Sequence, residues 1–583
     1  TEVMITLSNA PGYAPVENVI VSLSIDDPMI TIINSEFVFD EVVASGSEFD
    51  AQFLFTSSES MSFGDIPFNL NLSAELSGNF PSSLSYETYE LETEVLIPFG
   101  FNQDGYPIEN LNIQGSPLFT DLYGNSFPQI YFGSDSMMYG TWISGFDAIG
   151  FPFEVESEIS SSAAAGDLDG DEDKELVFGS MDGTLYALNK NGTEYLNYVQ
   201  PDPIIGFPVL NDLDNNGSLE IIFIAGNDTS AALYAINNAG DDVTGFPVTI
   251  PERIVTGPAV ADIDGSGTAD IVIVTLDSNV YAIDAYGSLK SGFPFLTSDG
   301  IQTPATLADL DGDQDLEIIT GNEGGNVYVL HHDGSVMASF VTEHPIRGGV
   351  SIADLDRNGQ MELLFSGLDQ FIHAWDPIAD AEITGWPVNI GSGSISEPIV
   401  VDLDNDLDLE VITATIEGTI YISHHDGSSY QNFPYISQDS IHSTPAIGDL
   451  DNDGDYELIV GTAVNLKVLD ILDIGGDQYS WKAYRGNSHR DGYYDVSLSY
   501  LAMDKNMTPT EFSLGNNYPN PFNPVTNITY GLPEDMRVMI TVYDIKGRVV
   551  KTLVDSRQSA GHNSIFWNGT NDFGAPVSTG LYF

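Results

Sequence analysis

The stretch of sequence that decides the fold is Asp167-Leu168-Asp169-Gly170-Asp171-Glu172-Asp173-Lys174-Glu175. Its pattern is Asp-x-Asp-x-x-x-x-x-(Glu/Asp), and it occurs seven times along the chain. The steps between the first residues of successive copies are 45, 50, 47, 45, 48 and 47 residues. A near-constant period of this size is typical of a propeller or a solenoid, in which each repeat forms one supersecondary unit.

Each repeat has the pattern of four short strands. In one clear copy, residues 303–309 precede the acidic loop, residues 316–321 follow it, and residues 325–330 come after a tight turn. A fourth strand is expected to begin at a Gly-(Phe/Trp)-Pro triplet such as Gly245-Phe246-Pro247. Four strands in about 47 residues make one propeller blade, so residues 99–497 are predicted to form a β-propeller.

A weaker copy of the repeat precedes the seven. Asp121 lies in phase with them, and its loop has Tyr123, Asn125 and Gln129 where the others have acids, so we expect a blade without a cation. One blade per repeat predicts eight blades. Seven blades would result if the weaker copy only supplied strands that close the ring. Residues 481–487 are predicted to be the outer strand that closes it.

The acidic loops suit a hard divalent cation. Side-chain oxygens at positions 1, 3 and 5, a backbone carbonyl at position 7 and a carboxylate at position 9 would supply the six or more oxygens that Ca²⁺ binds at about 2.3–2.6 Å. Mg²⁺ demands a stricter octahedron, whereas zinc and copper prefer His or Cys, which all seven loops lack. Without a cation the carboxylates would repel one another. We therefore expect about seven calcium sites rather than solvated acidic turns.

The predicted ligands share the positions 1, 3, 5, 7 and 9 of their loops. In chain order they are Asp167, Asp169, Asp171, Asp173 and Glu175; Asp212, Asp214, Asn216, Ser218 and Glu220; Asp262, Asp264, Ser266, Thr268 and Asp270; Asp309, Asp311, Asp313, Asp315 and Glu317; Asp354, Asp356, Asn358, Gln360 and Glu362; Asp402, Asp404, Asp406, Asp408 and Glu410; and Asp449, Asp451, Asp453, Asp455 and Glu457.

Two further β-domains flank the repeats. Residues 1–98 alternate apolar and polar side chains in short runs, which predicts a β-sandwich of immunoglobulin type. Residues 498–511 have the composition of a linker, and residues 512–583 have the alternating runs of a second small sandwich. The predicted fold class is therefore all-β: an N-terminal immunoglobulin-like sandwich, an eight-bladed (alternatively seven-bladed) propeller and a C-terminal immunoglobulin-like domain.

The loops resemble the calcium loops of FG-GAP repeats, also called VCBS repeats, which occur in the integrin α-subunit propeller and in many secreted bacterial proteins. The usual family pattern is Asp-x-Asn-x-Asp-Gly-x-x-Asp. Here the third position is Asp and the ninth is mostly Glu. The resemblance covers about 400 residues and implies calcium binding. In integrins the opposite face of the propeller binds the ligand.

The C-terminal segment resembles the type A sorting domain of the type IX secretion system. The resemblance rests on residues 517–524 (Asn-Tyr-Pro-Asn-Pro-Phe-Asn-Pro), the Lys546-Gly547 turn and Gly580-Leu581-Tyr582-Phe583. A similar fold occurs in the flagellar hook-capping protein. The resemblance implies that the export machinery reads this domain and that the chain is secreted or attached to the outer cell surface. The family usually continues beyond Gly-x-Tyr-Phe, so we expect this domain to be truncated.

The charge balance excludes several classes of partner. The chain has 16 Lys and Arg against 87 Asp and Glu, a formal net charge of −71. Nucleic acids and anionic membranes need basic residues on the protein, so neither is an expected partner. There is no cysteine, and no apolar run is long enough for a transmembrane helix. Residue 1 falls within sandwich-like sequence, so we expect an export signal or a further domain upstream.

No catalytic motif is visible in the sequence. It lacks a nucleophile elbow, a His-Glu-x-x-His zinc motif and a phosphate-binding loop. The pairs His331-His332 and His424-His425 occupy equivalent turns and are interpreted as exposed hairpin residues rather than a zinc site. Trp142, Trp375 and Trp386 offer sugar-stacking surfaces, but packing inside the blades is the favoured interpretation.

Three functions are consistent with these patterns. The favoured one is a secreted or cell-surface, calcium-stabilised propeller that binds an extracellular glycan or protein without catalysis. The second is an accessory C-terminal part of a secreted hydrolase, a protease or a polysaccharide-degrading enzyme, whose catalytic domain lies upstream. The third is a catalytic propeller such as a polysaccharide lyase.

Overall fold

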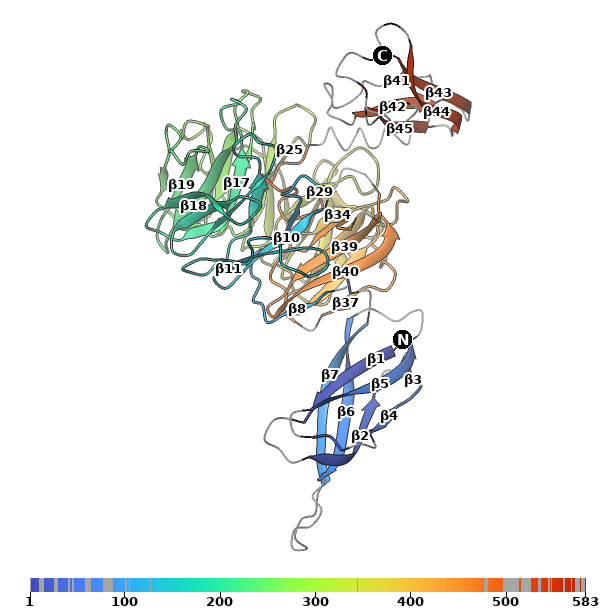
Figure 1. The fold of residues 1–583 in the computed structure, drawn as a ribbon. Helices are drawn as coiled ribbons and strands as arrows, with labels where there is room; N and C mark the ends of the chain where they lie inside the picture. Colours follow the sequence, from blue (N-terminus) through green and yellow to red (C-terminus); the bar gives the residue numbers. More distant parts are fainter. Residues whose placement is uncertain are drawn as a thin grey trace. The chain divides into compact units, whose positions relative to one another are not determined.

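The structure is a computed structural model (Figure 1). It describes residues 2–9, 15–25, 30–39, 42–44, 47–57, 64–76, 88–99, 102–103, 105–495 except 126, 343, 438, 452 and 477–480, and then 513–514, 526–532, 536–543, 546, 548–558, 561–567, 569–571, 577 and 582. All regular elements in these segments are strands. Accordingly, no helix in the described part of the chain is long and apolar enough to cross a membrane. The predicted linker, residues 498–511, lies outside the described residues.

The N-terminal domain is a sandwich of two antiparallel sheets, as the alternating pattern predicts. Val19, Val21 and Phe68 of one sheet and Ala51 and Phe53 of the other are buried in one shared core. One sheet has the order β1 (Glu2–Ser8), β5 (Glu48–Ser57), β3 (Ile30–Ile32), and the other has the order β7 (Thr88–Phe99), β6 (Gly64–Leu76), β2 (Val16–Ser24), β4 (Glu36–Phe39).

The repeats form eight small antiparallel sheets, which are the blades of a propeller (Figure 1). Inner to outer, blades 1 to 4 contain β9 (Leu118–Thr120), β10 (Gln129–Ser134), β11 (Met137–Thr141), β12 (Phe153–Glu154); β13 (Ala164–Gly166), β14 (Glu175–Gly179), β15 (Thr184–Leu188), β16 (Glu194–Val199); β17 (Ile204–Asn211), β18 (Glu220–Gly226), β19 (Ala231–Ile236), β20 (Val248–Ile250); and β21 (Ala259–Ala261), β22 (Asp270–Val274), β23 (Asn279–Ile283), β24 (Phe295–Leu296).

The same order continues in the second half of the ring. Blades 5 to 8 contain β25 (Thr306–Ala308), β26 (Glu317–Gly321), β27 (Asn326–Leu330), β28 (Val336–Val341); β29 (Ser351–Ala353), β30 (Glu362–Ser366), β31 (Phe371–Asp376), with both β32 (Ala381–Glu382) and β33 (Val388–Asn389) on β31; β34 (Ile399–Val401), β35 (Glu410–Ala414), β36 (Thr419–Ser423), β37 (Tyr435–Ile436); and β38 (Ala446–Gly448), β39 (Asp455–Gly461), β40 (Asn465–Ile474), β8 (Ile108–Glu109).

The weaker copy of the repeat forms a complete blade. Strands β9 to β12 pair in the same order as the strands of the other blades, so the count is eight. Blade 8 takes its outer strand, β8, from the chain just before blade 1. Ile130 and Phe132 of blade 1 share a buried cluster with Ile459 and Val468 of blade 8. The last blade is thereby joined to the first by both pairing and packing.

The Gly-aromatic-Pro triplet marks the outer strand as predicted. In blades 1, 3, 4 and 6 a strand begins directly after the proline of this triplet, as β20 does after Pro247. Gly245 has a φ of 105°, and a Cβ atom there would collide with the carbonyl oxygen of Tyr286 in the next blade. Glycine is therefore required because the blades approach one another this closely.

The prediction of a closing outer strand at residues 481–487 is wrong. Residues 481–494 instead form a central segment that contacts the inner strands of six blades. Because its carbonyls accept bonds from so many blades, it must lie on the axis of the ring. The bonds, of 2.8–3.0 Å, run from the amides of Ala165, Leu210, Val260, Leu307, Val400 and Ile447 to the carbonyls of Ser488, His489, Asp491, Gly492, Trp481 and Lys482.

Two fully buried arginines hold the central segment in place. Arg485 pairs with the buried Glu397 of blade 7, with 3.4 Å between Nη1 and Oε2, and its amide donates to Glu397 Oε1 at 3.0 Å. The indole of Trp481 donates to the same carboxylate. Arg490 donates to the carbonyls of Ala163 and Pro117 at 3.0 and 3.1 Å. Buried charges need such partners, because an unpaired one is costly.

We predict that Arg485→Met destabilises the propeller by about 3–5 kcal/mol, because it leaves the Glu397 carboxylate buried and unpaired. Calorimetric melting measures this loss. Arg347→Met is the matched control: Arg347 makes an exposed bidentate pair with Glu323, both bonds 2.8 Å, and its loss is expected to cost less than about 1 kcal/mol. Equal melting temperatures for the two variants would contradict the prediction.

Candidate metal centres

Each acidic loop connects the inner strand of its blade to the second strand. Position 1 directly follows the inner strand. Position 9 is the first residue of the second strand, except in blade 8, where Glu457 lies near the start of β39. Antiparallel pairing sets Glu175 opposite Gly166 and Glu317 opposite Ala308, next to position 1 of the same loop. The blade thus places the ends of the nine-residue pattern side by side.

The position 9 carboxylate makes the same bond in all seven loops. One of its oxygens accepts the amide of position 2 at 2.6–3.2 Å. In the weaker copy, Gln129 Oε1 accepts the amide of Leu122 in the same way, at 3.3 Å, and contributes no carboxylate.

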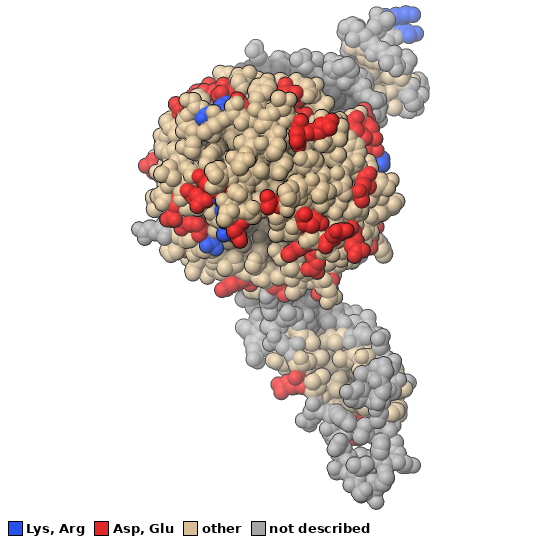
Figure 2. Space-filling model, turned by 90° about the vertical axis from the view of Figure 1, so that its left-hand side faces the viewer, with Lys and Arg blue, Asp and Glu red and all other residues tan. Residues whose placement is uncertain are grey.

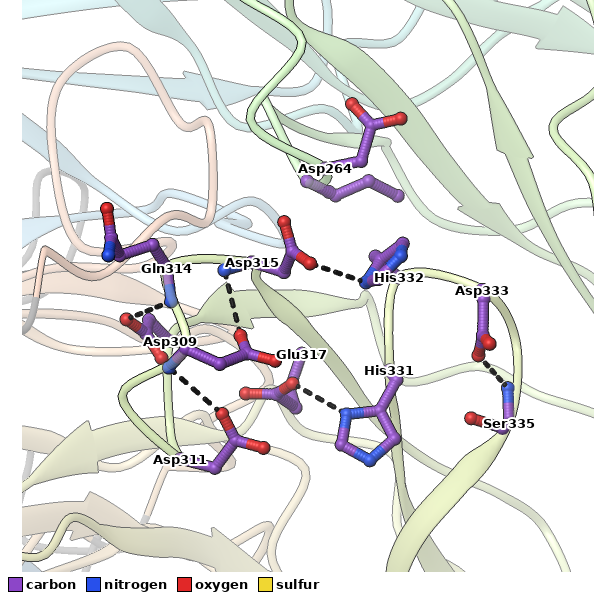
Figure 3. Close-up of polar contacts among 12 residues, drawn as sticks. Asp264, Asp309, Asp311, Gln314, Asp315, Glu317, His331, His332, Asp333 and Ser335 are labelled. Atoms are coloured by element: carbon purple, nitrogen blue, oxygen red, sulfur yellow. Dashed lines mark hydrogen bonds and ion pairs between the residues drawn. The ribbon is translucent and has the colours of Figure 1, made fainter.

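The loop amides fix the carboxylates of positions 1 and 3. In blade 5, Asp309 accepts the amide of Gly312 at 2.7 Å, and Asp311 accepts that of Asp313 at 3.2 Å. Asp309 also accepts the amide of Gln314 at 3.1 Å (Figure 3). The position 5 side chain instead accepts the amide of position 7, as Asp171 does from Asp173. Hydrogen bonds from the backbone amides thus orient the carboxylates before any cation binds.

Three or four potential ligand side chains converge in each of the best-defined clusters, where the ligand atoms lie within 4.8 Å of one another. Positions 1, 3 and 9 meet in blades 2, 3 and 4. In blade 5 the cluster contains positions 3 and 9 with His331, and in blade 8 it contains positions 3, 5, 7 and 9. The members are Asp167, Asp169 and Glu175; Asp212, Asp214 and Glu220; Asp262, Asp264 and Asp270; Asp311, Glu317 and His331; and Asp451, Asp453, Asp455 and Glu457.

The remaining two loops have the same electrostatics. Glu362 of blade 6 lies close enough to Asp354 and Asp356, and Glu410 of blade 7 to Asp402 and Asp404, for their charges to raise the pKa of the glutamate. Around the whole propeller, Asp and Glu side chains outnumber Lys and Arg, and Figure 2 shows them as separate patches over one face.

Burial and crowding shift the protonation of these glutamates. Burial, followed by the neighbouring carboxylates, raises the pKa of Glu175 and Glu220 to about 7 and that of Glu362, Glu410 and Glu457 to about 8. Glu362 Oε1 is a buried acceptor with no hydrogen-bond partner. An oxygen-lined cluster with surplus negative charge and an unused acceptor fits a hard cation such as Ca²⁺.

In three of the loops, a basic side chain from a neighbouring turn contacts the position 9 acid. His331 Nδ1 lies 3.0 Å from Glu317 Oε1 in blade 5 (Figure 3), and His424 Nδ1 lies 3.0 Å from Glu410 Oε1 in blade 7. In blade 4, Lys290 Nζ lies 2.7 Å from Asp264 and 2.6 Å from Asp270. Although burial lowers the pKa of Lys290, its bonds to these two carboxylates outweigh burial and raise it.

The histidine pairs are therefore not simple exposed hairpin residues. His332 and His425 contact the position 7 side chains Asp315 and Asp408 at 3.1 and 3.5 Å, and all four imidazoles are about one-third exposed. The signal was in the strand register: Ile318 pairs with Leu330, so the residue after Leu330 must lie beside Glu317. The repeat period alone does not reveal which residues face one another across paired strands, so it misses this contact.

The tryptophans pack within the blades. Trp375 is fully buried, and Trp386 is buried and donates its indole hydrogen to the carbonyl of His425 in the next blade at 2.9 Å. Trp142 is half-buried and its ring lies 5.4 Å from that of Tyr123.

A polar cavity lies on the axis at the other end of the inner strands. It encloses about 180 Å³, and its lining includes Ser116, Ser162, Thr256, Arg347, Thr444 and Tyr484. Most of these residues lie in the few positions before an inner strand, whereas the acidic loops follow the inner strands. The cavity and the loops are therefore on opposite faces of the propeller, and Tyr484 of the central segment lines the cavity.

Family models match two parts of the chain. Residues 212–273, 309–365 and 402–460 match the FG-GAP-like repeat, and each match contains two of the acidic loops. These segments are FG-GAP-like repeats. Residues 519–583 match the FlgD Ig-like domain. In that domain, the described strands are β41 (Ser513–Leu514), β42 (Thr526–Leu532), β45 (Gly561–Trp567) and the hairpin of β43 (Met536–Tyr543) with β44 (Val549–Gln558). The search of curated proteins found no match.

Solved structures with a related fold include the biofilm matrix protein Bap1 of V. cholerae. It is 11% identical, has a TM-score of 0.50, and the match covers 68% of this chain and 96% of that one. The computationally designed protein Ika8 is 14% identical with a TM-score of 0.47, covering 64% and 100%. BamB from Moraxella catarrhalis is 13% identical with a TM-score of 0.44, covering 63% and 97%. At such identities the likeness to Bap1 shows the fold alone.

We predict that the stability of the metal-free protein falls as the pH rises from about 5 to 8. The buried glutamates have folded pKa values near 7 to 8, above their ordinary value of 4.5, so the unfolded chain binds fewer protons in this window. Calcium should reverse the trend, because it binds the ionised form. Melting temperatures in EDTA and in calcium at pH 5, 6.5 and 8 test this. A melting temperature indifferent to EDTA at pH 8 would contradict it.

Proposed function

We propose that this chain is a calcium-stabilised propeller that binds an extracellular ligand without catalysis. The observation that carries the proposal is the set of oxygen-lined loops, in which carboxylates from both ends of the loop converge within 4.8 Å. A divalent ion there would join the inner strand to the second strand of its blade. The match of three segments to the FG-GAP-like repeat supports the same function.

Calcium dependence favours a place outside the cell. The sequence has no cysteine, so disulfides cannot cross-link the domains. Bound calcium supplies an alternative cross-link, and extracellular modules hold it with dissociation constants of about 10⁻⁴–10⁻³ M. The surplus of negative charge also keeps such a protein soluble and apart from nucleic acids.

The axial cavity is the proposed ligand site. Hydroxyl groups of Ser116, Ser162, Thr256 and Thr444 and the guanidinium of Arg347 offer hydrogen bonds within a space of about 180 Å³. The hydroxyl oxygens of Ser162, Ser116 and Thr444 accept backbone amides, and each hydroxyl keeps an O–H to donate to a polar group such as the hydroxyl of a sugar ring. A glycan end is therefore the proposed ligand.

We predict that the purified chain is retained on one or more immobilised polysaccharides and leaves their length unchanged. Arg347→Met should keep the melting temperature and weaken retention at least tenfold, because it removes the only charged group among the lining residues named above. Lys190→Met, on the acidic-loop face, is the control and should bind normally. Retention without dependence on Arg347 would exclude this cavity, and shortened polysaccharide would show catalysis.

The C-terminal domain is proposed to direct export by the type IX machinery. Its match to the FlgD Ig-like domain over residues 519–583 supports an immunoglobulin-like fold of the kind expected for such a sorting domain. The motif at residues 517–524 that suggests the role lies outside the described residues.

We predict that a reporter fused ahead of residues 512–583 reaches the surface or the medium of a bacterium with a type IX system. In a strain without that system the reporter should stay in the periplasm. The same reporter fused to residues 1–98 serves as the control and should stay there in both strains. Equal export of both fusions would contradict the proposed role.

A further inference from the structure

The blade 4 loop differs in composition from the other six. Its position 9 is Asp270, whereas every other loop has Glu there, and its position 5 is Ser266, where the other loops have Asp or Asn. Aspartate is one methylene shorter than glutamate, so its carboxylate ends about 1.5 Å farther from the centre of the loop. This leaves a space that a side chain from outside the loop can enter.

Lys290 fills that space with a positive charge. Its Nζ lies 2.7 Å from Asp264 Oδ2 and 2.6 Å from Asp270 Oδ2, which are the position 3 and position 9 ligands predicted for a metal ion. The side chain of Lys290 is only 13% exposed, and that of Asp270 is 1% exposed. The ammonium group is therefore held inside the cluster rather than on its surface.

The position of Lys290 is apolar in the equivalent blades. The amide of Lys290 donates to Ala282 of the third strand at 2.8 Å, and the same bond is made by Val243 in blade 3, Ile383 in blade 6 and Tyr430 in blade 7. Val243 packs against the hydrophobic core between blades 3 and 4. A lysine here gives up such packing, so the gain must come from the carboxylates that it contacts.

We propose that the Lys290 ammonium group is the resident cation of the blade 4 loop, so that this loop takes no divalent ion. Calcium would need the same oxygens at about 2.3–2.6 Å, which would bring two cations into contact distance. Six loops then bind calcium, and the seventh, in blade 4, holds the ammonium group of Lys290 in place of a metal ion. The inference rests on the proposed calcium function of the other loops.

Lys190 provides the contrast in blade 2. It pairs with Asp173 at position 7, whose side chain lies outside the cluster of Asp167, Asp169 and Glu175, and it is 36% exposed. A lysine near a loop is therefore not sufficient to fill it. Of these two lysines, it is Lys290 that reaches the acids of positions 3 and 9.

The test counts calcium ions bound by the full chain after EDTA treatment, with calcium alone as the probe, by calorimetric titration and by elemental analysis after dialysis. The wild-type chain should bind six ions. Asp262→Ala in blade 4 should leave the count unchanged, whereas Asp309→Ala in blade 5 should lower it by one. Lys290→Val, which installs the residue of blade 3, should raise the count to seven, and Lys190→Val should leave six.

The outcomes separate the two proposals. If the wild-type chain binds no calcium, the proposed calcium function fails. If Asp262→Ala lowers the count by one, or if folded Lys290→Val binds no additional ion, calcium binding stands and the role of Lys290 is overturned. Lys290→Met keeps the aliphatic stem, so it replaces the valine variant in the count if that variant does not fold. The Asp262→Ala comparison does not depend on either.

Discussion

Repulsion between carboxylates a few ångströms apart is the constraint on which the propeller depends. Each loop brings position 9 beside position 1 because the strands that flank it pair directly, and the backbone amides then fix the acids facing one another. A blade whose loop carries these acids therefore creates the cluster when its first two strands pair. Burial and this crowding raise the pKa of Glu175 to about 7 and that of Glu362 to about 8, and a bound cation would favour their ionised form at neutral pH. Sheet pairing and cation binding are thus parts of one equilibrium.

The negative charge of the cluster is balanced or avoided in different ways around the ring. Blade 1 replaces the position 9 acid with Gln129, which keeps the bond to the position 2 amide and contributes no charge. Blade 4 admits Lys290, blades 5 and 7 place an imidazole beside the glutamate, and blade 6 leaves an oxygen of Glu362 without a partner. The repeats share a backbone but differ in how they balance charge, which a consensus pattern hides.

Much of the fold could be predicted from the sequence, because its signals are local. The repeat period predicts the number and bounds of the blades. The glycine of Gly245-Phe246-Pro247 lies where two blades come so close that only glycine fits. The central segment could not be predicted: residues 481–494 act through carbonyl groups, which every residue has. The contacts of Lys290 and His331 with the loops were also missed, since they lie 20 and 14 residues from the acids they meet, and only the strand register brings them together. The calcium ligands themselves remain a prediction.

The central segment also sets an order of events along the chain. The inner strands of six blades donate amides to it, and a buried amide without an acceptor costs about 1–3 kcal/mol. A nascent chain that has not reached residue 494 therefore lacks part of the central segment, and inner-strand amides are left without their acceptors. Its last blade is then held by the pairing with β8 but lacks its bond to the central segment. Because the C-terminal domain follows the central segment in the sequence, any chain that contains that domain also contains the segment that completes its propeller. A product truncated before residue 494 lacks both.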